Sequence, residues 1–213
     1  MPPTSEARTL PFMDEYAVSA NWYDFIVGRP LASVFRRMSG LLAGQGAVLD
    51  ICSGTGLLAE VFAGAGIPAT GVDLSPAMLA VSRKKRPHIP VALADATALP
   101  FLDASFPAAT LTFALHEKPE PVRQAIFREA IRVVGPHGLV VLADYRHPHG
   151  ASRLGAWGVH CVERLAGGEH FANYRNWMRT GAAEGFLDRM NARWKLRRTA
   201  LSGTTGLYFV SQS

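Results

Sequence analysis

An acid and two glycines stand where an apolar run ends, in the stretch VLDICSGTGLLAE. Glycines at such a turn let the backbone approach a ligand that a Cβ atom would exclude. The helix expected to follow offers free N–H groups to a carboxylate or phosphate. A carboxylate directly before the turn repels a pyrophosphate but attracts a cationic amino group. The predicted ligand contacts of this turn are Asp50, Cys52, Ser53, Gly54 and Gly56.

Two further acids stand where the next apolar runs end. Asp73, in TGVDLSPAML, lies 17 residues after Gly56 and suits the hydroxyls of a ribose. Asp95, in ADATALPF, suits the exocyclic amine of adenine, and the N–H of Ala96 suits a ring nitrogen. An adenosine-bearing cofactor is therefore predicted. Simpler roles stay open: Asp73 as an acid favoured at a helix N-terminus, Asp95 as a loop cap and Asp50 as a buried acid satisfied locally.

A histidine and a glutamate follow the fourth apolar run, in TFALHEKPEP. Histidine titrates near neutral pH, so His116 is a candidate base that removes a proton from a second substrate, here called the acceptor. Glu117 is a candidate to orient that histidine or to attract a cationic substrate. The alternative is that both residues cap the helix expected from Glu120. Asp144 and Tyr145 end the next apolar run and are candidates for the border of the acceptor site.

Other polar and aromatic residues lie outside these strand ends. Tyr16, in the leading segment, is a candidate to bond the carboxylate of the cofactor, with packing as the alternative. The run His147-Pro148-His149, with His160 and Cys161, lacks a tight ligand constellation, so no metal site is predicted. The aromatic residues around His160 are instead expected to line an acceptor pocket or to form a lid.

The elements that position these residues alternate along the chain. Strands are expected at 47–51, 69–73, 90–94, 108–113 and 138–144, and helices at 57–65, 76–85 and 120–134. Strands that are apolar on both faces and alternate with helices indicate a parallel sheet covered on both sides. Ligands of such sheets bind beyond the carboxyl ends of the strands. This edge would gather the residues named above.

The chain is predicted to form one domain with four parts. Residues 1–43 form an N-terminal helical lid segment, 44–145 a cofactor-binding core, 146–190 a less regular acceptor-side insertion, and 191–213 a C-terminal pair of antiparallel strands. A length of 213 residues with 48% hydrophobic content suits a single core.

Charge and hydropathy limit the classes of partner that the chain is expected to bind. The formal net charge is +5, and the basic runs at 82–88 and 191–199 are interpreted as solvated faces. No nucleic-acid partner is expected, whereas contact with an anionic membrane surface stays open. No apolar run approaches the ~20 residues of a membrane span, and the first dozen residues do not resemble a secretory signal. A cytoplasmic location is therefore expected.

Four motifs in order carry a family resemblance: VLDICSGTG, GVDLSPAML, ADATALPF and RVVGPHGLVVLADY. They resemble the class I S-adenosylmethionine-dependent methyltransferases, above all the branch with the ubiquinone- and menaquinone-biosynthesis enzymes. The resemblance covers about residues 47–145, and NWYDFIVGRP is more loosely similar to bacterial phospholipid N-methyltransferases. It implies a Rossmann-like, doubly wound, mostly parallel seven-stranded sheet with an antiparallel C-terminal strand, and S-adenosylmethionine as cofactor. The predicted cofactor contacts further include Leu74, Met78 and Ala114.

The predicted activity is methyl transfer to a small-molecule or lipid-type acceptor. A quinone-like ring, a phospholipid amine or a related metabolite fits, and the chain has FALHEKP where quinone methyltransferases usually carry an Arg-Asn pair. One alternative is a cofactor-binding protein without catalysis. The other is an NAD(P)-dependent oxidoreductase, because Gly54-x-Gly56-x-x-Ala59 also fits a dinucleotide fingerprint. The chain lacks the Tyr-x-x-x-Lys pair of short-chain dehydrogenases, which argues against that alternative.

Overall fold

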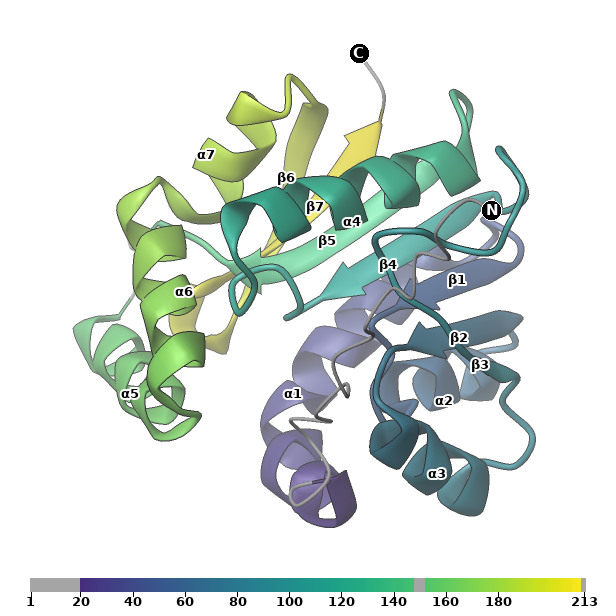
Figure 1. Ribbon diagram of the computed structural model, residues 1–213, viewed down its shortest axis with the longest axis horizontal. Helices are drawn as coiled ribbons and strands as arrows, with labels where there is room; N and C mark the ends of the chain where they lie inside the picture. Colours follow the sequence, from purple (N-terminus) through teal and green to yellow (C-terminus); the bar gives the residue numbers. More distant parts are fainter. Residues whose placement is uncertain (1–19, 148–151, 212–213) are drawn as a thin grey trace, which may run out of the picture.

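A seven-stranded sheet runs through the molecule in the order β3-β2-β1-β4-β5-β7-β6 (Figure 1). The computed structural model describes residues 20–147 and 152–211. The first five strands are parallel, and β7 pairs antiparallel with β5 and β6. The predicted fold class is thus confirmed. The strands are β1 Val48–Ile51, β2 Ala69–Asp73, β3 Val91–Leu93, β4 Ala108–Thr112, β5 Leu139–Tyr145, β6 Arg193–Ala200 and β7 Thr205–Ser211.

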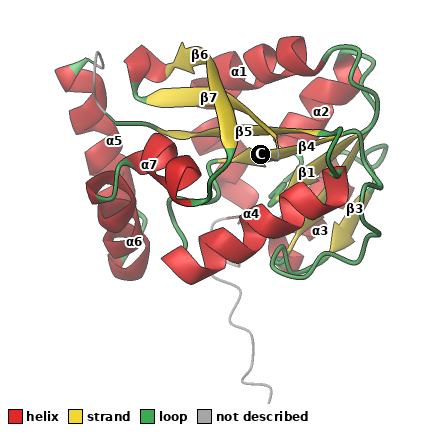
Figure 2. Ribbon diagram, turned by 90° about the horizontal axis from the view of Figure 1, so that it is seen from above, coloured by secondary structure: helices red, strands yellow, loops and turns green. Residues whose placement is uncertain are grey.

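Helices cover both faces of this sheet. Helices α1 and α2 lie over one face, and α4 and α7 lie over the other (Figure 2). A single 3₁₀ turn joins β6 to β7. No helix in the described part of the chain is long and apolar enough to cross a membrane. The helices are α1 Ala20–Leu42, α2 Leu57–Gly64, α3 Pro76–Lys85, α4 Glu120–Val134, α5 Arg153–Leu165, α6 Gly168–Arg179 and α7 Ala182–Arg189, with the 3₁₀ turn at Leu201–Gly203.

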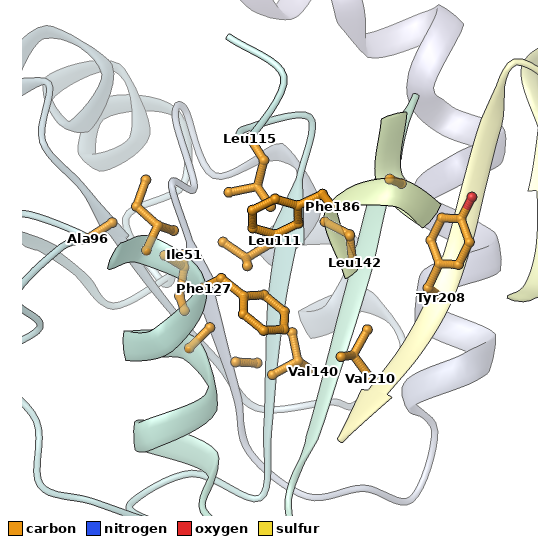
Figure 3. Packing of buried hydrophobic residues seen from close by; sticks show 14 of the residues in the cluster. Ile51, Ala96, Leu111, Leu115, Phe127, Val140, Leu142, Phe186, Tyr208 and Val210 are labelled. Carbon is orange, nitrogen blue, oxygen red and sulfur yellow. The ribbon is translucent and has the colours of Figure 1, made fainter. Parts of the chain in front are cut away.

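The apolar pattern of α4 shows how the core forms. Its buried residues, which include Phe127, Ala130 and Val134, recur at helical spacing and form one stripe. Figure 3 shows Phe127 facing Leu111 of β4 and Val140 of β5. The central strands are buried on both faces, as the apolar runs predicted.

Local sequence signals define the ends of two helices. The hydroxyl of Ser75 caps α3 by accepting a hydrogen bond from the N–H of Met78 at 3.1 Å, and Pro76 begins that helix. Gly135 ends α4 with a φ of 67°.

The prediction of a less regular insertion at 146–190 is wrong. Residues 153–189 form α5, α6 and α7. Glycines within these helices lower their intrinsic helix propensity, which made the segment read as irregular. Buried apolar side chains on α6 and α7, among them Trp177, Phe186 and Leu187, provide the stabilising contacts that propensity does not.

Candidate functional site

Asp73 joins two turns at the carboxyl end of the sheet. One carboxylate oxygen accepts a hydrogen bond from the N–H of Gly54 at 2.7 Å, and the other accepts from the N–H of Ser75 at 2.9 Å. Burial raises the pKa of Asp73, and these backbone hydrogen bonds oppose that rise. Each oxygen keeps a second lone pair, so a ligand diol has acceptors at this strand end.

Asp50 lies buried in β1 beside that turn. Its Oδ1 accepts a hydrogen bond from Thr110 Oγ1 at 2.7 Å, whereas Oδ2 is buried without a hydrogen-bond partner among the described residues. Burial, with a smaller contribution from Asp73, raises the pKa of Asp50 to about 7. A buried carboxylate with an unpaired oxygen suits a cationic ligand group, as the sequence predicted for Asp50.

The two glycines of the turn have different surroundings. Both have positive φ, 55° at Gly54 and 80° at Gly56. A Cβ at Gly56 would lie 2.7 Å from Ser82 Oγ, whereas a Cβ at Gly54 would meet no atom of residues 20–147 or 152–211 within 4 Å. Gly54 therefore borders open space from which a ligand can approach the backbone, and Gly56 provides close packing of α2 against α3.

The cysteine and the serine of the turn are both constrained by the fold. Cys52 has a φ of 60°, a conformation that costs strain in a residue with a Cβ, and burial raises the pKa of its thiol. Ser53 Oγ lies against β2, where a Cβ on Gly71 would come within 2.6 Å of it. Its N–H donates to Val72 O at 2.9 Å. Ser53 is thus positioned to fasten the turn to β2.

The remaining predicted cofactor contacts occupy varied places. Asp95 is exposed, and its Oδ1 accepts from the N–H and the hydroxyl of Thr97 at 2.8 and 2.7 Å, which is the loop cap left open above. Met78 is buried against Ala20 of α1. Ala96 and Ala114 are buried, Leu74 is 43% exposed, and Tyr16 lies outside the described residues.

Helix α1 is tied to the glycine turn by charge. Asp24 accepts hydrogen bonds from Thr55 Oγ1 at 2.5 Å, Lys85 Nζ at 3.1 Å and Arg86 at 3.0 Å. Arg86 also donates to the carbonyl of Thr55. Burial raises the pKa of the Tyr23 hydroxyl, as do the negative charges of Glu117 and Asp73. The start of α1 therefore lies beside the glycine turn and α3.

His116 is enclosed by two carboxylates. Its Nδ1 lies 2.8 Å from Asp144 Oδ1, and its Nε2 lies 3.5 Å from Glu163 Oε2. Burial opposes a charge on the ring, but Asp144 and Glu163 outweigh burial and raise the pKa of His116 to about 10. Both ring nitrogens are engaged, so this arrangement does not present His116 as a general base. The residue that orients the ring is Asp144 rather than Glu117.

Glu117 contacts a different histidine. Its carboxylate lies 3.6 Å from Nδ1 of His170 on α6 and 3.0 Å from Lys118 Nζ. Nε2 of His170 lies 2.5 Å from Glu163 Oε2. Tyr145 donates its hydroxyl proton to Glu163 Oε1 at 2.7 Å. Sequence reasoning missed Glu163 because a single glutamate on an amphipathic helix carries no spacing signal.

Arg123 fixes the turn that carries this cluster. This fully buried side chain on α4 donates to the carbonyls of Leu115 at 2.8 Å, His116 at 3.3 Å and Asn173 at 2.7 Å. It thereby joins the turn after β4 to α6. Two groups of residues thus lie at the carboxyl end of the sheet. One is the glycine turn with Asp73, and the other is the histidine–carboxylate cluster of His116, Glu163 and His170.

Aromatic side chains surround the cluster on its α5–α6 side. The rings of Tyr145 and Tyr174 lie 4.7 and 6.4 Å from that of His116, and Phe171 stacks on Tyr174. A cavity of about 650 Å³ lies between α5 and α6, with Tyr174 and His160 in its wall. Tyr174 is therefore shared between this cavity and the cluster.

A family model described as "Methyltransferase domain" matches residues 48–138. This segment begins with β1 and includes the glycine turn, Asp73 and His116. Residues 48–138 therefore match a methyltransferase domain. The predicted recognition is confirmed, and the dinucleotide alternative gains no support from this match.

The methyltransferase domain has relatives among curated proteins and solved structures. A demethylmenaquinone methyltransferase from Renibacterium salmoninarum is 42% identical over 109 residues, which span 51% of this chain and 45% of that protein. The chain thus spans less than half of that relative. A protein of Pyrococcus horikoshii, PH0226, shares the fold with a TM-score of 0.68 and 16% identity, covering 95% of this chain and all of that one. The DhpI–SAH complex gives 0.65 and 16%, covering 93% of each chain.

Proposed function

We propose that this protein transfers the methyl group of S-adenosylmethionine to a lipid-type, quinone-like acceptor. The observation that carries the proposal is the pair of acids at neighbouring strand ends. The buried Oδ2 of Asp50 has no hydrogen-bond partner among the described residues, and Asp73 keeps acceptor lone pairs. An amino acid joined to an adenosine needs one acid for its ammonium group and one for its ribose hydroxyls. The open side of Gly54 leaves room for the atoms between them.

In this proposal Asp50 holds the ammonium group and Asp73 the ribose, while Asp95 and Ala96 remain proposed for the adenine. S-adenosylmethionine supplies an electrophilic methyl carbon when bound. The chain aligns an acceptor with that carbon and excludes water, and alignment of this kind accounts for much of the acceleration in such reactions. His116 contributes position rather than proton abstraction, because both of its ring nitrogens face carboxylates.

A lipid-type acceptor is supported by exposed apolar side chains on two helices. Trp22, Phe25 and Ile26 of α1 are 61–82% exposed, and Trp157 and Leu165 of α5 are 68 and 87% exposed. Both helices extend on the side of the sheet where β4 ends (Figure 1). Exposed apolar groups of this size suit contact with lipid or with a long apolar tail. The Renibacterium relative is named for demethylmenaquinone, a lipid-soluble quinone, which agrees with this class.

The test incubates the full chain with methyl-labelled S-adenosylmethionine and one of three acceptors: demethylmenaquinone in liposomes, a total lipid extract, or a polar metabolite extract. Label is then measured in the organic and aqueous phases. We expect label in the organic phase with demethylmenaquinone. Label only in the aqueous phase contradicts the lipid-type acceptor, and cofactor binding without label in any arm favours a cofactor-binding protein without catalysis.

A matched pair of variants separates the site from nonspecific effects. Asp73→Asn keeps the size of the side chain but weakens its bonds to the turn and to ribose, so cofactor affinity should fall at least tenfold. Asp103→Asn changes an acid whose side chain is 81% exposed beside Arg132 and should leave both affinity and transfer unchanged.

A further inference from the structure

Three ligand-type side chains converge beside the turn after β4. His116 from that turn, Glu163 from α5 and His170 from α6 each place one nitrogen or oxygen within 4.8 Å of the other two. Both Nε2 atoms face the same oxygen, Glu163 Oε2, at 3.5 and 2.5 Å. His116 and Glu163 are buried, and the side chain of His170 is 23% exposed. The site is therefore buried at His116 and Glu163 and accessible to solvent at His170.

The surroundings of the three side chains orient them toward a common point. Asp144 accepts from Nδ1 of His116, which leaves the Nε2 lone pair of the neutral ring directed inward. Glu117 lies on the Nδ1 side of His170, at 3.6 Å, which is beyond hydrogen-bond distance. Tyr145 occupies Glu163 Oε1 and leaves Oε2 for the centre. Metal-binding histidines usually donate the opposite ring N–H to a carboxylate or carbonyl in this way.

Charge balance also favours a cation at this point. Two buried carboxylates, Asp144 and Glu163, contact the imidazoles, whereas Glu117 also pairs with Lys118 Nζ at 3.0 Å. Buried carboxylates require positive charge close by. A divalent ion among the three ligand atoms would supply that charge.

We propose that His116, Glu163 and His170 bind one divalent transition-metal ion of the Zn²⁺ or Fe²⁺ class. Two imidazoles and one carboxylate form the ligand set of catalytic zinc sites and of nonhaem iron sites, and they leave coordination positions open. Metal–ligand distances of about 2.1 Å place tetrahedral ligand atoms roughly 3.4 Å apart. The His116–Glu163 distance of 3.5 Å already fits, and the accessible His170 needs to withdraw by about 1 Å.

The position of the site suggests its role, and this step rests on the proposed function. His116 follows the carboxyl end of β4, and β4 pairs with β1, whose end carries the glycine turn. The proposed ion therefore lies beside the predicted cofactor residues. An ion there would bind a hydroxyl oxygen of the acceptor and lower its pKa. It would thereby supply the activation that an enclosed His116 does not.

The experiment titrates Co²⁺, a spectroscopic substitute for Zn²⁺, into chelator-treated full-length protein without cofactor. We expect visible d–d absorption that saturates at one ion per chain and is reversed by Zn²⁺. The variants Glu163→Gln and His170→Asn should each weaken Co²⁺ binding more than tenfold. His160→Asn, which alters an exposed histidine on the same helix as Glu163, should leave it unchanged.

Several results would overturn the proposal. One is the absence of any absorption change when Co²⁺ is added to the wild-type chain. The other is equal Co²⁺ affinity in the wild type and in the folded His170→Asn variant. Circular dichroism and urea unfolding establish that His170→Asn is folded, and a partly exposed position makes that the expected result. S-adenosylmethionine affinity is measured separately by calorimetry, so a failed metal site and a failed methyltransferase function are distinguishable.

Discussion

Asp144 of β5 fixes the orientation of His116 after β4. Its Oδ1 lies 2.8 Å from Nδ1 of the imidazole, and its Oδ2 accepts the backbone N–H groups of Leu115 at 3.2 Å and His116 at 3.3 Å. Oδ1 also accepts the N–H of Tyr145 at 2.7 Å. One buried carboxylate thus sets both the path of the turn and the direction of the ring. The neighbouring parallel strand therefore determines what this turn presents.

Asp144→Asn should destabilise the fold. An amide keeps the volume but has a single oxygen, and its NH₂ group meets backbone donors while the charge opposite His116 is lost. Breaking a buried pair costs about 3–5 kcal/mol, so we expect a loss near 3 kcal/mol in the free energy of unfolding, measured in urea. Asp103→Asn serves as control and should change stability by less than about 0.5 kcal/mol. A loss as small as the control's would mean that the pair contributes little.

Asp50 should make stability fall as pH rises. Its pKa is raised from 3.8 to about 7 in the folded chain because burial disfavours the charge. A carboxyl with a raised folded pKa favours folding most at low pH, and that contribution is lost as pH rises from about 4 to about 7. The shift corresponds to roughly 4 kcal/mol. Urea unfolding of the wild type and of Asp50→Asn at pH 5 and pH 8 measures this loss. The free energy of unfolding of the wild type, minus that of the variant, should be smaller at pH 8 than at pH 5.

The same residue should make cofactor affinity depend on pH. A cationic amino group pairs with ionised Asp50, so binding of S-adenosylmethionine should strengthen between pH 5.5 and pH 7 with release of a proton. Thr110 donates to Asp50 and Asp73 contributes a like charge, and these are the groups that act on its ionisation. Calorimetry in two buffers of different ionisation heat counts the protons. Affinity that stays flat with pH in the wild type contradicts the assignment of Asp50 to the ammonium group.

Helix α1 should depend on Asp24 for its hold on the glycine turn. Burial opposes ionisation of Asp24, but hydrogen bonds from Thr55, Lys85 and Arg86 outweigh it and lower its pKa. The resulting stabilisation is present above pH 4 and is lost as pH falls below it. We expect Asp24→Asn to expose the start of α1 to protease and to weaken cofactor affinity severalfold. Glu169→Gln, a change on the exposed start of α6, should do neither.

The parallel core was predictable because its signals are local. Apolar runs, the Ser75 cap and the Gly135 end lie within a few residues of what they specify, and the observed bounds of these elements differ from the predicted ones by at most one residue. Asp50 and Asp73 were found for the same reason, since parallel strands bring their carboxyl ends together. These positions follow from topology alone.

The histidine–carboxylate cluster was not predictable because it depends on packing between distant elements. Glu163 and His170 lie on α5 and α6, in the segment that was expected to be less regular. Nothing in their spacing indicates that both face His116. Prediction of a base at His116 used its strand-end position, whereas its chemistry is set by Asp144 and Glu163, which come from β5 and α5.

Alanine at the two glycines of the turn should affect different properties: stability at Gly56 and cofactor affinity at Gly54. At Gly56 an added Cβ would lie 2.7 Å from Ser82 Oγ, and the alanine would have to keep a φ of 80°. Gly56→Ala should therefore lower the free energy of unfolding by about 2 kcal/mol or more. At Gly54 the Cβ meets no atom of the described part of the chain within 4 Å, so only backbone strain of about 1 kcal/mol applies. That Cβ instead enters the space proposed for the cofactor.

Gly54→Ala should therefore weaken S-adenosylmethionine binding at least tenfold while unfolding in urea close to the wild type. Gly56→Ala should lose stability first, and at temperatures where it remains folded its affinity should fall less than that of Gly54→Ala. Calorimetry and urea unfolding on the same preparations measure both quantities. If Gly54→Ala binds the cofactor like the wild type, the ligand does not approach the turn at Gly54, and the proposed binding mode is wrong.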